Sequence, residues 1–204
     1  MNFLANILSG MITVVALIGF SATAQAHTGD GPHNGWLHGF LHPLSGLDHL
    51  LAMIAVGMWS MQLSKHLDKH VVWLMPVIFV IAMGLGGLLG FMTLPLGFAE
   101  HGIALSLLVT GLLIALTMHL SFPASALLIG VFAVCHGYAH GNEMPDDVVM
   151  LEYAAGFMLA TALLHVIGIG LAFLMYRIKR DQWLRYAGLA VALSGAVMLV
   201  GNVG

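Results

Sequence analysis

The chain has 204 residues, of which 60% are hydrophobic and only 7% are charged. This composition is typical of a polytopic membrane protein and leaves no room for a sizeable soluble domain beside one helical bundle. A net charge of −3 with six basic residues gives no basis for nucleic-acid binding, and a single cysteine excludes both an intrachain disulfide and a multi-cysteine zinc site.

The first 26 residues have the pattern of a secretory signal peptide. An apolar run from Leu4 to Phe20 is followed by Ala24-Gln25-Ala26, which matches a small-x-small cleavage site. No Lys or Arg precedes the apolar run, so an uncleaved first transmembrane helix is the alternative. We expect cleavage, because a polar segment follows directly, and one membrane domain formed by residues 27–204.

Six further apolar stretches are long enough to cross a bilayer, which takes about 20 helical residues. The expected fold class is therefore all-α, a polytopic membrane bundle of six transmembrane helices after a cleavable signal peptide. The connections between the stretches are short. The predicted spans cover residues 40–63, 71–92, 99–119, 122–142, 149–176 and 185–203.

The basic residues predict the orientation of these spans. All of them fall in the first and fifth connections, which lie on one side of a six-span protein, whereas the opposite connections carry acidic residues and no basic ones. By the positive-inside rule the basic side faces the cytoplasm, so both mature termini face outward. The basic residues are Lys65, Lys69, Arg177, Lys179, Arg180 and Arg185.

Two groups of ionisable residues lie within the apolar stretches. An aspartate at the centre of a membrane helix costs about 2.5 to 3.5 kcal/mol on insertion scales, so such groups face a partner, a cavity or an ion. Imidazole and carboxylate together are the ligand set of a divalent transition metal. The groups are His42, Asp48 and His49 in the first span, and His136, His140 and Glu143 in the fourth.

Helical spacing predicts how the fourth-span group is arranged. His136, His140 and Glu143 are separated by four and three residues, so they form one stripe on one helix face. The predicted topology places this stripe at the outer end of its helix. Glu100 and His101 open the third span on the same side and are candidate accessory ligands.

In the first span, His42 and His49 are seven residues apart and are expected to share a helix face. Pro43 is expected to start that helix and leave His42 at its mouth. Asp48 points to one side of the stripe. It either binds the ion directly or accepts the second ring N–H of a ligating histidine.

The remaining histidines are weaker candidates. His66 and His70 flank lysines in a connection and are expected to be solvated. His119, at the inner end of the third span, and His165, deep in the fifth, are either hydrogen-bonding groups of the bundle or candidates for an exit path. Possible accessory metal ligands are His27, His33 and His38 in an N-terminal tail that would capture ions, and His165 deep in the fifth span.

The two motifs, His42-x5-Asp48-His49 and His136-Gly-Tyr-Ala-His140-Gly-Asn-Glu143, resemble the signatures of the HupE/UreJ family. These are nickel or cobalt permeases associated with hydrogenase and urease maturation. The resemblance implies a non-enzymatic protein of the bacterial inner membrane with periplasmic termini, which hands metal to cytoplasmic metallochaperones. It also implies that His42, Asp48, His49, His136, His140 and Glu143 form the ion-binding and translocation site.

One departure from the family pattern is Cys135, where the family often has an aromatic residue, and this leaves a shift in metal preference open. The ligand chemistry allows Co²⁺, zinc or copper as well as Ni²⁺, which the resemblance favours. The chain has no Gly-x4-Gly-Lys-Ser/Thr loop, so we expect secondary transport or facilitated diffusion instead of ATP coupling.

Two other functions stay open at this stage. Ser45, Asp48, His49, His136 and His140 resemble the constellation of alkaline ceramidase-like hydrolases, in which zinc activates water within the membrane. The second open function is that of a sensor or chaperone subunit, which binds metal without moving it across the membrane. The energy source and the number of subunits do not follow from the sequence.

Overall fold

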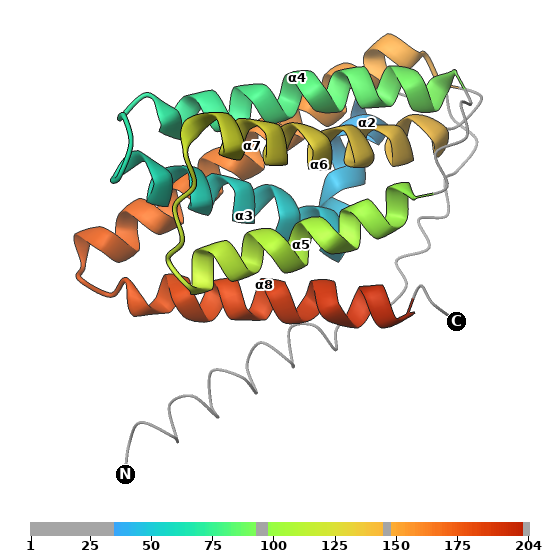
Figure 1. Cartoon of the computed structure of the whole chain (residues 1–204). Helices are drawn as coiled ribbons and strands as arrows, with labels where there is room; N and C mark the ends of the chain where they lie inside the picture. The colour runs from blue at the N-terminus through green and yellow to red at the C-terminus, as the bar shows by residue number, and fades with distance from the viewer. Residues whose placement is uncertain (1–34, 93–97, 145–147, 202–204) are drawn as a thin grey trace. The chain divides into compact units, whose positions relative to one another are not determined.

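The computed structural model describes residues 35–92, 98–144 and 148–201, and all regular structure in that part of the chain is helical (Figure 1). The predicted all-α class is therefore confirmed. The proposed signal peptide, His27 and His33 lie outside the described residues. The helices are α2 (Gly35–Ser45), α3 (Leu47–Ser64), α4 (Val71–Phe91), α5 (Ala99–Ala115), α6 (Phe122–Asn142), α7 (Met150–Arg177) and α8 (Gln182–Gly201).

Within the described residues, four helices are long and apolar enough to cross a membrane: α4, α6, α7 and α8. The pair α2 and α3 meets the same criterion as one broken span, and α5 is a shorter apolar helix. Large apolar side chains face outward along these helices, for example Leu127, Leu151 and Val200, which are 70%, 74% and 77% exposed. A soluble protein rarely exposes so much contiguous apolar surface, so these faces suit contact with lipid.

The first predicted span, residues 40–63, is two helices instead of one. α2 and α3 meet at an angle of 82°, and Gly46 between them has an extended backbone with φ −94° and ψ 121°. Pro43 lies inside α2 and does not start a helix, so that expectation was wrong. Proline removes an amide hydrogen from the helical ladder, and the Ser45 hydroxyl donates a hydrogen bond to the His42 carbonyl at 2.7 Å. Both features favour a helix end at this point.

α2 is held against α7 by close backbone contact at two glycines. A Cβ atom at Gly39 would collide with the backbone carbonyl of Tyr153, and one at Gly156 would collide with the carbonyl of Trp36. Small residues allow this approach between membrane helices. The contact fixes the short α2 helix, and His42 with it, beside the first half of α7.

α3 forms the core of the bundle, with α4, α5, α7 and α8 packed around it. Its Met53, Trp59 and Leu63 side chains are fully buried. α6 packs mainly on α4, and α8 mainly on α5. The arrangement surrounds the polar residues of α3 with other helices instead of lipid.

The two basic connections lie at the same end of the bundle, as the sequence predicts (Figure 1). The Lys65 ammonium, after α3, lies 3.5 Å from the centre of the Tyr176 ring near the end of α7. At that end the His66 and His119 rings also stack, with centroids 4.1 Å apart. The connections α3–α4, α5–α6 and α7–α8 therefore share one face of the protein.

Candidate metal centre

Four imidazole rings from three helices meet at the other end of the bundle, and we call His42, His49, His136 and His140 the imidazole cluster. The His140 ring centroid lies 4.6 Å from that of His42 and 4.1 Å from that of His49. The His49 and His136 centroids are 5.6 Å apart. The two motifs, distant in sequence, thus lie side by side.

The route by which His42 and His49 come together differs from the prediction. They do not share a face of one helix, because the bend at Gly46 puts His42 on α2 and His49 on α3. Their ring centroids are nevertheless 6.5 Å apart. The bend lets two helices approach α6 from different directions, which a single straight helix does not allow.

His136 presents an unpaired nitrogen to the cluster. Its ring is fully buried, and Nδ1 lies 2.9 Å from the Phe132 carbonyl one turn earlier. A carbonyl only accepts, so Nδ1 carries the proton and Nε2 carries a free lone pair. This Nε2 atom is buried and has no hydrogen-bond partner in the described part of the chain.

His49 is arranged in the same way by Asp48. Its Nδ1 lies 2.8 Å from Asp48 Oδ1, so the carboxylate accepts a hydrogen bond from Nδ1–H, and in the neutral ring Nε2 carries the free lone pair. Nε2 is buried and, among the described residues, lacks a hydrogen-bond partner. Of the two roles predicted for Asp48, the geometry favours the orienting one, which is common around metal-binding histidines.

Glu143 completes the cluster at its exposed edge, just after the end of α6. Its Oε2 lies 3.6 Å from His42 Nε2 and 3.7 Å from His140 Nδ1, and its side chain is 53% exposed. One ligand atom from each of these three residues lies within 4.8 Å of the others. Ligand atoms about 2.1 Å from a common ion lie at most about 4.2 Å apart, so the two measured separations suit one ion.

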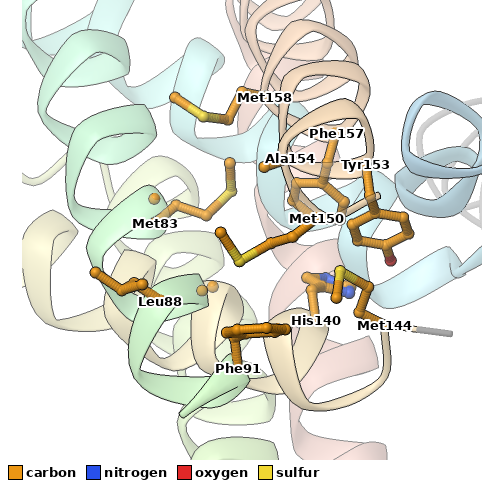
Figure 2. A pocket seen from close by; sticks show the side chains of 14 residues that line it. Met83, Leu88, Phe91, His140, Met144, Met150, Tyr153, Ala154, Phe157 and Met158 are labelled. Atoms are coloured by element: carbon orange, nitrogen blue, oxygen red, sulfur yellow. The ribbon is translucent and has the colours of Figure 1, made fainter. Parts of the chain in front are cut away.

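A pocket of about 230 Å³ adjoins the cluster between α4, α6 and α7. His140 lies on its wall, and Figure 2 shows methionine side chains around the same space. Its lining is otherwise apolar and aromatic. The methionines are Met83, Met144, Met150 and Met158.

Aromatic side chains around the cluster are the functional neighbours that sequence reasoning missed. The Phe157 ring on α7 lies 4.3 Å from that of His140, and the Tyr153 ring lies 5.9 Å from that of His42. Phe79 on α4 contacts His136 at 5.7 Å. These residues help to bury the His136 and His140 imidazoles. The only signal in the sequence is spacing of four between Tyr153 and Phe157, which ordinary core aromatics share.

The accessory candidates are spread over the described structure. His38 lies on α2, one turn before His42, whereas Glu100 and His101 are exposed at the start of α5. Within the described residues no contact is found between this last pair and the cluster. His165 is fully buried in α7, and its ring lies 5.0 Å from that of Phe79.

Comparison with known proteins agrees with the two motifs. The family model described as HupE / UreJ protein matches residues 15–198. Protein HupE of Rhizobium leguminosarum bv. viciae is 42% identical over 193 residues, which are 95% of this chain and 98% of the relative. No solved structure matches. Neither match supports the hydrolase alternative.

Proposed function

This chain belongs to the HupE/UreJ family, and from that premise we propose that it is a permease that moves Ni²⁺, or Co²⁺, across the bacterial inner membrane into the cytoplasm. It works as a secondary transporter or by facilitated diffusion. The ion passes through the site formed by the imidazole cluster with Asp48 and Glu143.

One observation carries this proposal: buried imidazole nitrogens from separate helices converge without partners. His49 Nε2, His136 Nε2 and both ring nitrogens of His140 are buried and lack hydrogen bonds within the described residues. Unpaired buried polar atoms are rare because each costs about 1 to 3 kcal/mol. A divalent cation satisfies several of them at once, and Glu143 supplies negative charge at the mouth.

The proposed topology has six spans after a signal peptide formed by residues 1–26. The bent pair α2–α3 provides the first span of the permease domain, residues 27–204. α5, with 17 residues, is about 26 Å long at 1.5 Å per residue, close to the roughly 30 Å of a hydrocarbon core. The basic connections face the cytoplasm, and both mature termini face the periplasm.

Ions would reach the cluster from the periplasm. The N-terminal tail with His27, His33 and His38 captures them, with Glu100 and His101 as further accessory ligands on the outer side. On the inner side, the cargo passes to cytoplasmic metallochaperones for hydrogenase or urease. Membership of the family favours nickel as the transported ion, while cobalt, zinc and copper suit the same donors.

The decisive test is flux through the purified chain alone in proteoliposomes. We expect ⁶³Ni²⁺ to accumulate with wild-type protein and to be lost with His136→Ala and with His140→Ala. His70→Ala is the matched control, because that imidazole is exposed at the opposite end of the bundle. Unchanged uptake in both cluster variants would remove the site assignment, and binding without flux would identify a sensor or chaperone instead.

Ser45→Ala separates transport from hydrolysis. A hydrolase that uses the Ser45 hydroxyl would lose activity, whereas a permease keeps its flux. In the structure this hydroxyl donates a hydrogen bond to a backbone carbonyl and not to a side chain of the cluster, and Pro43 still favours the helix end without it, so we expect the variant to transport like the wild type.

A further inference from the structure

His165 is a buried imidazole that the cluster does not account for. Its side chain is fully buried in the middle of α7. Neither Nδ1 nor Nε2 has a hydrogen-bond partner within the described residues. A neutral imidazole in such a place loses its hydrogen bonds to water and gains none in return, so its presence needs a reason beyond packing.

The surroundings of His165 connect it to the imidazole cluster. The Phe79 ring on α4 lies 5.0 Å from the His165 ring and 5.7 Å from the His136 ring, so it contacts both. One helical turn away, the Thr161 hydroxyl on α7 lies 3.7 Å from the Met83 sulfur on α4. Both of these side chains are buried. Nitrogen, oxygen and sulfur donors therefore lie about one helical turn apart where α4 packs on α7.

The position of His165 along α7 is intermediate between the two ends of the bundle. Phe157, which contacts the cluster, precedes it by eight residues, or about 12 Å of helix. Tyr176 follows it by eleven residues, or about 16 Å. Tyr176 lines a pocket of about 320 Å³ at the inner end, together with Gln62 at the end of α3 and Lys65 in the connection that follows. The Gln62 Oε1 atom there is buried and, among described residues, unpartnered.

Resting on the permease function above, we propose that His165, with Thr161 and Met83 beside it, forms a second metal-binding station between the imidazole cluster and the inner pocket. Imidazole and thioether donors suit a late transition-metal ion and disfavour Mg²⁺ and Ca²⁺. The station offers one imidazole, one neutral hydroxyl and one thioether, and no carboxylate. It therefore binds more weakly than the outer site, as an ion that must leave again requires.

The test compares two substitutions with opposite expectations. His165→Leu fills the space with an apolar side chain but offers no donor, whereas His165→Cys fills it poorly but offers a thiolate that binds Ni²⁺ and Co²⁺. If His165 is a station, ⁶³Ni²⁺ flux in proteoliposomes falls by about tenfold or more in His165→Leu, with KM little changed, and recovers in part in His165→Cys. If His165 only fills space, the flux is instead higher in His165→Leu than in His165→Cys.

Equilibrium binding separates this inference from the proposed function. Both variants are expected to bind Ni²⁺ at the outer site with wild-type affinity. Ser106→Ala is the control, because that buried hydroxyl on α5 bonds only within its own helix, to the Ile103 carbonyl. Wild-type flux in His165→Leu overturns the station and leaves the permease intact, whereas absence of flux in the wild type overturns the permease itself. If His165→Leu does not fold, a tenfold loss in folded His165→Cys also overturns the station.

Discussion

Asp48→Asn tests whether the carboxylate acts by orienting His49. The wild-type carboxylate accepts a hydrogen bond from His49 Nδ1–H at 2.8 Å and so directs the unprotonated Nε2 into the cluster. Asparagine has the same shape but is neutral and can turn its NH₂ group toward the ring, which favours the wrong tautomer. Loss of such an outer partner lowers metal affinity about 10- to 100-fold, or about 1.4 to 2.7 kcal/mol.

The assay is competitive titration of Ni²⁺ into purified protein in detergent, with a chelator of known affinity. Asp68→Asn is the matched control, because Asp68 and His70 form a similar but exposed pair in the connection before α4. We expect wild-type affinity in the control. Unchanged affinity in Asp48→Asn would refute the orienting role, and total loss of binding would make Asp48 a direct ligand.

Four further predictions concern the same end of the bundle. Glu143→Gln removes a carboxylate that faces two imidazoles, so its loss of affinity in the same titration exceeds that of Asp48→Asn; a smaller loss contradicts direct ligation. Gly46→Ala puts a Cβ atom 2.7 Å from the His49 ring and 2.8 Å from Asp48, so it disturbs that pair and lowers the Ni²⁺ affinity. The double variant with Asp48→Asn loses less affinity than the sum of the two single losses, because both substitutions disturb the same contact; additive losses in this double-mutant cycle argue against a shared effect. Gly39→Ala forces α2 away from α7 and lowers the free energy of unfolding by about 1 to 3 kcal/mol, measured by thermal unfolding. Gly170→Ala is the control, because open space surrounds that position, and it leaves stability unchanged; equal melting temperatures in the two variants would contradict the close contact. Protons and metal ions compete for the same imidazole nitrogens, so affinity and flux fall together once the pH is low enough to protonate the cluster; an affinity that stays constant down to the lowest pH at which the protein stays folded counts against imidazole ligands.

Much of the fold follows from the sequence because the apolar stretches and their separators are unambiguous. α4, α6 and α7 begin and end within two residues of their predicted spans. The break at Gly46 was missed, because one glycine three residues after Pro43 also suits a kinked but continuous helix. The end of α5 at Ala115, four residues before the predicted limit at 119, coincides with a turn in which Thr117 has a positive φ of 53°. Hydropathy alone does not report such a turn.

The residues brought together at the candidate site were also predicted, since spacing of four and three fixes His136, His140 and Glu143 on one side of α6. Spacing did not predict which of the site residues bind the ion and which orient a ligand. The orienting role of Asp48 depends on a contact between adjacent residues whose side chains usually diverge on a helix. The role of Phe157 depends on how α7 packs beside α2, which sequence periodicity does not encode.

An ion that passes through a protein must bind strongly enough to enter and weakly enough to leave, and the two sets of donors differ in the number of ligands that they offer. The outer set has four imidazoles, an orienting aspartate and a partly exposed glutamate, so it competes with water for a dilute ion. The inner set around His165 has one imidazole and no charge. A metal ion held much more firmly at the second position than at the first would be retained there, because each tenfold gain in affinity costs about 1.4 kcal/mol on release. Adding a carboxylate beside His165, as in Thr161→Glu, would therefore convert a permease into a metal trap, with more tightly bound Ni²⁺ and less flux.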